Sequence, residues 1–359
     1  MIGETIGHRS VRIPRLLRLV ESRSALIDEL AGLGQRCRFL VVHSGEASPT
    51  RYGEAFMVDA RAAGLDVEDC VALSNTDAWV AAVRAAIARV HPDYVVGVGG
   101  GRVVDVAKVA AALDAIDFIG VPTQASSDGI CSPVAVMQEP DGRPKSLGAR
   151  IPVAVVVDMD VLSRAPLVTW RAGLGDLLSN LSAVQDWRQA HVKYGEPLDD
   201  FACLTAEAAA LSVYQVGADL QDRQFREKLM RGLILSGISM EMAGSSRPAS
   251  GSEHLIGHAL DRLLPEPRHH GLQVALTTIT TFILRGEDVS AKVQYFRSVG
   301  LPVHPSDLGI EMELYLRAVR MGAGLRPGRK TVLDEVGDKE IQALAEALES
   351  IAAKGSVAP

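Results

Sequence analysis

The first half of the chain alternates short apolar, β-branched runs with stretches of helical periodicity. The apolar runs predict buried strands at residues 37–42, 67–73, 94–98 and 118–121. Apolar residues at helical spacing predict helices over 16–30, 51–64 and 76–90. This alternation predicts a parallel sheet with right-handed crossovers, and a ligand crevice at the carboxyl ends of its strands.

A hairpin is expected after these elements, because residues 134–138 lead into the turn signal Asp141-Gly142 and the chain returns to a hydrophobic strand at 151–158. Helical periodicity then covers residues 177–192, 206–220, 225–242, 254–264, 273–284 and 339–353. We therefore predict the α/β class, with a Rossmann-like parallel-sheet domain over 1–162 and an all-helical domain over 163–359. The site is expected in the cleft between them.

The composition narrows the range of partners. A chain of 359 residues is long enough for two domains, and 47% hydrophobic with 23% charged residues is typical of a globular enzyme. A net charge of −7, without a dense block of Lys and Arg, gives no footprint for nucleic acid. No apolar run approaches the ~20 residues that span a bilayer, so we expect no membrane insertion. Any affinity for phosphate must be local.

The cysteines indicate a reducing compartment. Cys37, Cys70, Cys131 and Cys203 are scattered and form no Cys-x-x-Cys pair, which favours free thiols. The N-terminal residues offer no apolar core followed by a cleavage site. We expect a cytoplasmic protein.

A glycine-rich loop joins the strand at 94–98 to the next helix, with the sequence GVGGGRVVDVAK over residues 97–108. Glycines allow a ligand to approach the backbone, and the amides of the following helix N-terminus attract a pyrophosphate. A plain tight turn between strand and helix is the alternative. Asp105 is expected to fix the glycine loop from the first turn of the helix, and Lys108 is interpreted as a solvated residue on its outer face.

Three further motifs follow this loop in order: VPTQASSDGI at 121–130, AGLGDLLSN at 172–180 and GSSRPASGSEH at 244–254, before His270-Gly271. Together with GGGxxxDxxK at 99–108 they resemble successive signatures of sn-glycerol-1-phosphate dehydrogenases. That family is part of the wider group containing dehydroquinate synthase, glycerol dehydrogenase and iron-dependent alcohol dehydrogenases. The resemblance covers residues 90–275.

The resemblance implies a catalytic Zn²⁺ site made by Asp176, His254 and His270. Two imidazoles and a carboxylate leave an open position on the metal, which a Lewis acid needs. Taken alone, Asp176 could be a helix N-cap and each histidine a satisfied core residue. His258 shares a helix face with His254, and the resemblance assigns it to the substrate site. His269 competes with His270 for the third ligand position, and the His-Gly step favours His270.

Other residues are candidates for substrate or cofactor contacts. Asp128 resembles the substrate-contacting carboxylate of the family, with a plain turn residue as the alternative. Arg247 matches either a substrate phosphate or an ordinary ion pair. Asp176 and His258 complete the substrate set. The residues expected to bind NAD or NADP are Gly99, Gly100, Gly101, Arg102, Val103, Asp105, Thr123, Ser126 and Ser132.

Two positions depart from the family pattern. Leu272 stands where relatives usually have Glu after His-Gly, which removes one carboxylate from near the metal. At the end of the first predicted strand, relatives tend to show an Asp-containing turn that binds the adenosine ribose, and this chain has His43-Ser44-Gly45. Because a carboxylate there would repel a 2′-phosphate, its absence predicts that NADP is accepted as well as NAD.

The resemblance implies an NAD(P)-dependent, zinc-requiring dehydrogenase that interconverts glycerone phosphate and sn-glycerol 1-phosphate or a related polyol phosphate. The expected partner is therefore a small polyol phosphate or ketone phosphate, and we expect a homo-oligomer. Three alternatives stay open: a cyclase resembling dehydroquinate synthase, a specialised cyclitol or polyol dehydrogenase, and a cofactor-binding regulator with an inactive site.

Overall fold

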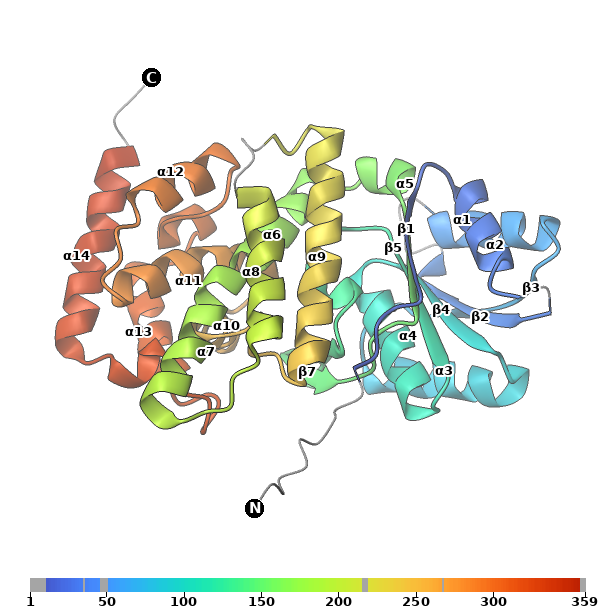
Figure 1. The fold of residues 1–359 in the computed structure, drawn as a ribbon, viewed down its shortest axis with the longest axis horizontal. Coiled ribbons are helices and arrows are strands. Elements are labelled where there is room, and N and C mark those ends of the chain that lie inside the picture. The colour runs from blue at the N-terminus through green and yellow to red at the C-terminus, as the bar shows by residue number, and fades with distance from the viewer. Residues whose placement is uncertain (1–10, 35, 46–50, 215–218, 267, 356–359) are drawn as a thin grey trace, which may run out of the picture.

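The protein has an α/β part followed by a helical part, which lie side by side in the computed structural model (Figure 1). The structure describes residues 11–34, 36–45, 51–214, 219–266 and 268–355. Its main sheet has six parallel strands in the order β1-β8-β5-β4-β2-β3. These strands are β1 (Leu16–Val20), β2 (Arg38–His43), β3 (Asp66–Val71), β4 (Tyr94–Gly99), β5 (Asp117–Pro122) and β8 (Ala154–Asp158).

Helices cover both faces of this sheet. Helices α1 (Arg23–Ala31) and α2 (Tyr52–Ala62) pack on one face, and α3 (Asp77–Val90) and α4 (Gly101–Leu113) pack on the other. Successive side chains of β2 point to opposite faces of the sheet. Val41 packs in the core under α1 and α2, and Leu40 and Val42 pack in the core under α3 and α4. The predicted doubly covered parallel sheet is confirmed.

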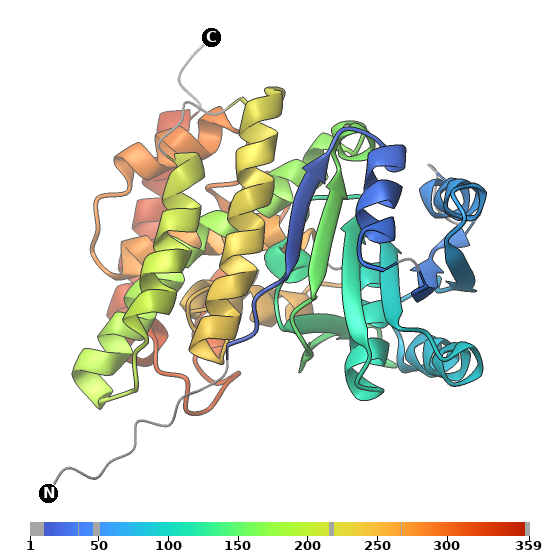
Figure 2. The same cartoon turned by 45° about the vertical axis from the view of Figure 1, so that its right-hand side comes forward.

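The helix predicted over residues 16–30 is wrong in its first half. Residues 16–20 form β1, which pairs in register with β8 from Leu16 opposite Ala154 to Val20 opposite Asp158. Ser22 then starts α1, where its side chain accepts a hydrogen bond from the amide of Ala25. In Figure 2 the blue β1 lies at the edge of the sheet beside the green β8.

The predicted hairpin is confirmed, with β6 (Val134–Gln138) antiparallel to β7 (Pro144–Gly148). Its turn contains Gly142 at a φ of 84°, which a glycine adopts without strain. The chain then crosses back to the main sheet, where β8 begins at Ala154 rather than at residue 151.

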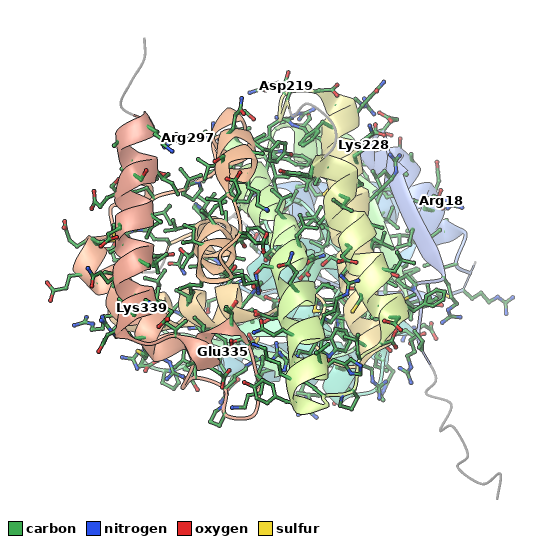
Figure 3. The ribbon with its side chains drawn as sticks, turned by 60° about the vertical axis from the view of Figure 1, so that its left-hand side comes forward. Arg18, Asp219, Lys228, Arg297, Glu335 and Lys339 are labelled. Atoms are coloured by element: carbon green, nitrogen blue, oxygen red, sulfur yellow. The ribbon has the colours of Figure 1, made fainter. Side chains whose placement is uncertain are left out.

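The rest of the chain is helical. The helices are α5 (Met159–Ser163), α6 (Leu167–Leu178), α7 (Asn180–Tyr194), α8 (Asp200–Tyr214), α9 (Arg223–Ala243), α10 (Ser252–Leu263), α11 (His270–Leu284), α12 (Ser290–Ser298), α13 (Met312–Gly322) and α14 (Asp338–Gly355). The helix predicted over 177–192 is two helices that meet at Ser179. The helix predicted over 206–220 is α8, and its last predicted residues fall partly outside the described ones. Figure 3 shows charged side chains such as Lys228 and Lys339 on the outside of this part.

The main hydrophobic core contains residues from both parts of the chain, including Val156 of β8, Leu174 of α6 and Leu233 of α9. The domain boundary expected near Leu162 therefore stays a prediction. Within the described part of the chain, no helix combines the length and the apolar character needed to cross a bilayer.

Candidate active site

The site is built on a close crossing of α6 and α11. A Cβ at Gly175 would collide with the carbonyl oxygen of Gly271, and a Cβ at Gly271 would collide with the carbonyl of Ala172. The two glycines thus let the helix backbones come into contact. Asp176 follows Gly175 and His270 precedes Gly271, so the close crossing brings these two side chains together.

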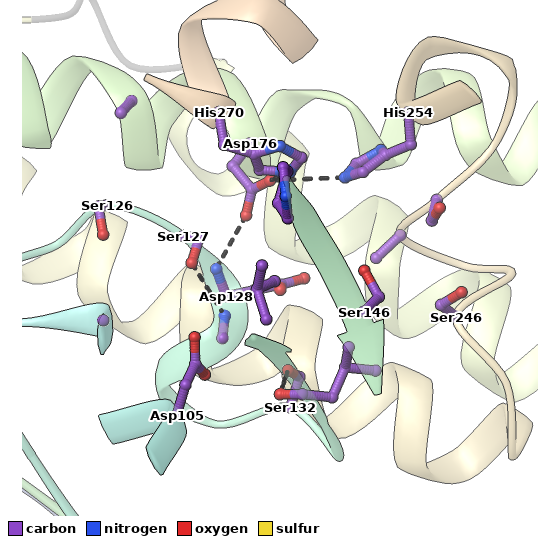
Figure 4. A pocket seen from close by; sticks show the side chains of 18 of the residues that line it. Asp105, Ser126, Ser127, Asp128, Ser132, Ser146, Asp176, Ser246, His254 and His270 are labelled. Atoms are coloured by element: carbon purple, nitrogen blue, oxygen red, sulfur yellow. Dashed lines mark hydrogen bonds and ion pairs between the residues drawn. The ribbon is translucent and has the colours of Figure 1, made fainter. Parts of the chain in front are cut away.

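Asp176, His254 and His270 converge at this crossing (Figure 4). Asp176 Oδ1 lies 3.7 Å from His254 Nε2 and 3.7 Å from His270 Nε2. One possible ligand atom from each of the three residues lies within 4.8 Å of the other two. The Asp176 side chain is 4% exposed. The structure therefore brings together the three residues that the sequence grouped, from three different helices.

These residues fit a divalent metal. Ligands about 2.1 Å from a tetrahedral Zn²⁺ are roughly 3.4 Å apart, so the observed separations need only small rotations of the side chains. The nitrogen and oxygen donors are those that zinc takes in catalytic sites. With three protein ligands, one coordination position would face the adjacent cavity.

A buried carboxylate orients His254. Glu253 is fully buried, its Oε1 lies 3.0 Å from His254 Nδ1, and its Oε2 accepts a hydrogen bond of 2.9 Å from Ser182. Although burial lowers the pKa of His254, its hydrogen bonds to Asp176 and Glu253 outweigh this and raise the pKa to about 9. Burial and the nearby charge of His254 lower the pKa of His270 to about 4. Glu253 stands inside the SGSEH motif at 250–254, where no pattern distinguishes it from an ordinary helix residue.

The other two histidines face the same cavity. The ring centroid of His258 lies 6.4 Å from that of His254 and 6.2 Å from that of His270, with Asp261 Oδ2 3.8 Å from its Nδ1. His269 precedes α11 and is exposed at the cavity wall. The cluster of possible metal ligands contains His270 and not His269, in agreement with the prediction from the His-Gly step.

Asp128 lies beside this cluster at the start of the short 3₁₀ helix η2 (Asp128–Ile130). Its amide donates a hydrogen bond of 2.8 Å to Asp176 Oδ2, and its carboxylate accepts one of 2.8 Å from Ser236. Burial and the neighbouring charge of Asp176 raise the pKa of Asp128 to about 7. No sequence signal pointed to Ser236, which reaches the site from α9.

Lys108 is not solvated, so the interpretation from the helical pattern was wrong. Its side chain is fully buried, and Nζ donates hydrogen bonds to the carbonyl oxygens of Gly129, Ser132 and Val134. A protonated lysine in this place ties the η2 loop and the start of the hairpin to α4. Lys108 thus fixes the backbone of the loop that carries Asp128.

A cavity of about 530 Å³ joins this cluster to the start of α4. Gly100 caps α4, and a Cβ there would meet the side chain of Gln124 at 3.0 Å. Val103 is buried against Gly99 and its amide bonds to the carbonyl of Gly100, while Thr123 donates its amide to Gly99. The cofactor candidates that line the cavity are Gly101, Arg102, Asp105, Ser126 and Ser132.

Comparisons with known proteins show the family of this chain. The family model for iron-containing alcohol dehydrogenases matches residues 20–166. The glycerol-1-phosphate dehydrogenase (NAD(P)+) of Hyperthermus butylicus is 37% identical over 327 residues, which are 89% of this chain and 90% of that protein. The enzyme of the same name from Methanothermobacter thermautotrophicus is 34% identical over 336 residues, 92% of this chain and 94% of that one. The chain belongs to the glycerol-1-phosphate dehydrogenase family.

Solved structures show the same fold. A probable glycerol dehydrogenase from Sinorhizobium meliloti 1021 superposes with a TM-score of 0.75 at 25% identity, covering 96% of this chain and 98% of that one. A sulfoacetaldehyde reductase from Bifidobacterium kashiwanohense in complex with NAD+ gives a TM-score of 0.68 at 16% identity, with the same coverage. The fold of this glycerol-1-phosphate dehydrogenase relative is therefore shared across the wider group.

Neither Arg247 nor Leu272 lines the cavity of this family member. Arg247 is 3% exposed and is occupied by Glu196, to which its Nε donates at 2.6 Å, and by the carbonyl of Lys330 at 2.9 Å. Of the two possibilities for Arg247, the structure contains the ion pair. Leu272, the departure after His270-Gly271, packs half-buried against the main core.

Asp105 also acts differently from the expectation. Within the described part of the chain, Asp105 makes no hydrogen bond to the glycine loop. Burial raises the pKa of Asp105 to about 6, while the charge of Lys108 and the backbone of Val136 lower it.

The second departure from the family pattern, at His43, lies in a hollow between α2 and the ends of β2 and β3. His43 Nδ1 accepts a hydrogen bond of 3.1 Å from the amide of Gly45, so Nε2 carries the proton. That Nε2 has no hydrogen-bond partner among the described residues, and Asp69 Oδ2 lies 3.7 Å away. The carboxylate that β2 lacks here is thus present on β3, where Arg61 pairs with it at 3.1 Å.

Proposed function

We propose that this protein is a zinc-dependent NAD(P)-linked dehydrogenase that interconverts glycerone phosphate and sn-glycerol 1-phosphate. One observation carries the proposal: a single cavity is lined at one side by the start of α4 and at the other by Asp176, His254 and His270. The family names of the relatives identify the reaction, and this arrangement supplies what it requires.

Different groups of residues along the cavity would bind the cofactor and the metal. The N-terminus of α4, at Gly101 and Arg102, is suited to a pyrophosphate because its amides and dipole attract anions. Asp176, His254 and His270 would hold the metal. A bound divalent metal and a bound nicotinamide supply a Lewis acid for the C2 oxygen and a hydride for C2.

The remaining groups orient the substrate and move a proton. Asp128, held by Ser236, is placed to hydrogen-bond a substrate hydroxyl beside the metal ligands. His258 is close enough to the cluster to exchange a proton with the C2 oxygen through water, and Asp261 faces its other side. Ser132 also lines the cavity and offers a hydroxyl to a bound ligand.

The free thiols support a reducing compartment. All four cysteines are unpaired, and Cys131 and Cys203 are buried. We therefore propose that the enzyme is cytoplasmic. Its homo-oligomeric state stays a prediction from the sequence.

Glycerone phosphate, zinc and NADH mixed with the purified protein test the proposal. We expect NADH consumption, and its loss on chelation with recovery when zinc is restored. His254→Ala and His270→Ala should lose the metal and at least a hundredfold in turnover. His269→Ala is the matched control, because His269 neighbours the cluster without joining it, and it should keep the metal.

Other outcomes identify the alternatives. No reaction with glycerone phosphate, together with conversion of a longer sugar phosphate without net loss of NADH, would indicate a cyclase. Stoichiometric zinc and cofactor binding without turnover of any polyol or polyol phosphate would indicate a regulator. Full metal content in His254→Ala or His270→Ala would remove the ligand assignment.

A further inference from the structure

A second, basic pocket continues the cavity beyond His258. His258 and Arg326 lie on the walls of both, as does Ser146 of the hairpin. The pocket lies between β7, α10 and the loop that follows α13. Its charged lining residues are Glu139, Arg143, Lys145, Asp261, Arg262 and Arg326.

Both acidic residues of this pocket already have partners within the protein. Glu139 Oε1 pairs with Lys145 at 3.2 Å, and Asp261 accepts a hydrogen bond of 2.8 Å from Gln273. Arg143 is 3.5 Å from Asp141 in the hairpin turn. In contrast, the side chains of Arg262 and Arg326 have neither a hydrogen bond nor an ion pair within the described part of the chain. Two guanidinium groups without partners therefore line this pocket. The pocket is locally basic even though the net charge of the whole chain is −7.

Arg326 lines the same cavity as Asp176, His254 and His270, so a substrate bound at the cluster shares that cavity with its guanidinium group. In glycerone phosphate the phosphorus is roughly 4 to 5 Å from the C2 oxygen, at about 1.5 Å per bond. The ring centroid of His258 lies 6.4 Å from that of His254 and 6.2 Å from that of His270, and His258 lines both the cavity and the basic pocket. The basic pocket therefore begins one side chain away from the cluster. Gly101 and Arg102 at the start of α4 line the cavity but not the basic pocket, so the cofactor phosphates and the substrate phosphate would not compete.

We propose that Arg326, assisted at the rim by Arg262, binds the phosphate group of the substrate. The guanidinium fork suits two phosphate oxygens, and the half-buried position of Arg326 protects the contact from screening. This inference rests on the proposed function. It transfers to Arg326 the role that the sequence left open for Arg247, which Glu196 occupies.

The test compares glycerone phosphate with glycerone, which lacks the phosphate. We expect wild-type protein to favour glycerone phosphate in kcat/KM, and Arg326→Ala to reduce that preference by about 10- to 100-fold, as for a lost charged hydrogen bond. Inorganic phosphate should inhibit wild type competitively and the variant more weakly by a similar factor. Arg326→Lys should recover part of the preference, because it keeps the charge without the fork.

Arg231→Ala is the matched control, since Arg231 is an exposed arginine on α9 paired with Glu227 at 3.1 Å. It should keep the wild-type preference. A wild-type protein without preference for glycerone phosphate would overturn the proposed substrate. A wild-type preference that survives in Arg326→Ala, or equal losses on both substrates, would overturn only the assignment of Arg326. A thermal melt confirms that each variant is folded.

Discussion

Glu253 shows how one side chain outside the ligand set controls the site. It contacts His254 Nδ1, which directs Nε2 at Asp176, and it is itself fixed by Ser182 and by the amide of Gly251. A carboxylate behind a metal-binding histidine sets its tautomer and raises its basicity. The precision of the ligand set therefore depends on a residue that would not touch the metal.

We predict that Glu253→Gln weakens zinc binding by about 10- to 100-fold while the protein stays folded. The amide keeps the shape but loses the charge that favours the correct His254 tautomer. Competition with a chelating dye measures the affinity. Glu349→Gln, at an exposed position of α14, is the control and should bind zinc like wild type. Unchanged affinity in Glu253→Gln would mean that Glu253 only fills space.

Individual residues were predictable where a motif grouped them. Asp176, His254 and His270 were chosen because the resemblance to glycerol-1-phosphate dehydrogenases implied them as one ligand set, and they lie together in the structure. Lys108 was misplaced, because a helical pattern does not show whether a polar position faces water or three backbone carbonyls. Arg326 gave no signal, since nothing in sequence shows that a guanidinium lacks a partner.

At the level of elements, the site depends on how closely α6 and α11 approach. Gly175 and Gly271 face each other at the crossing, and a Cβ at Gly175 would also lie 2.8 Å from the Cβ of Ala275. Backbone carbonyls cannot move aside as a flexible side chain can. The separation of two helices, and with it the spacing of Asp176 and His270, is thus set by the absence of two methyl groups.

We predict that Gly175→Ala lowers stability by about 1 to 3 kcal/mol through overpacking and also weakens metal binding. Gly257→Ala in α10 is the matched control: it too is a buried helical glycine, but its Cβ would meet only Val274 Cγ2, at 3.7 Å. That change should leave stability equal or higher, because alanine favours the helix. Thermal unfolding of both variants measures the difference. A Gly175→Ala protein as stable as Gly257→Ala would contradict the crossing argument.

Element types were predictable except where a segment was short. The parallel strands, the hairpin and most helices follow from periodicity, but β1 has only five residues, LLRLV, and their spacing fits a helix as well as a strand. The choice is made by β8, which offers a free edge to pair with. Such a partner is visible only in the assembled sheet.

For the whole molecule, the ends of neighbouring strands form one continuous edge. His43 of β2 pairs with Val98 of β4, so the hollow at His43 adjoins the glycine loop. Parallel sheets that bind dinucleotides do so at this edge, where an acidic group contacts the ribose and a nearby arginine accommodates a 2′-phosphate. Asp69 and its partner Arg61 supply both kinds of group.

We predict that wild-type protein uses NADPH within about tenfold of NADH, because Arg61 offsets the charge of Asp69. Arg61→Ala should move the preference toward NADH, and Asp69→Asn should move it toward NADPH. The ratio of kcat/KM for the two cofactors measures this. Arg84→Ala, which breaks an exposed pair with Asp114 on the other side of the sheet, should leave the ratio unchanged. A wild-type preference for NADH above about a thousandfold would refute the prediction.

The pairing of β1 with β8 sets an order on how the chain can fold during synthesis. Strands β2, β3, β4 and β5 each have a paired neighbour that is close in the chain. Strand β1 pairs with β8, from Leu16 opposite Ala154, and so cannot pair until β8 has been synthesised. A ribosome adding roughly 5 to 20 residues each second leaves β1 without its partner for on the order of ten seconds. Of the six strands, β1 is synthesised before the others but cannot pair until β8 is present, so its apolar face stays open to chaperones or to other nascent chains until β8 emerges.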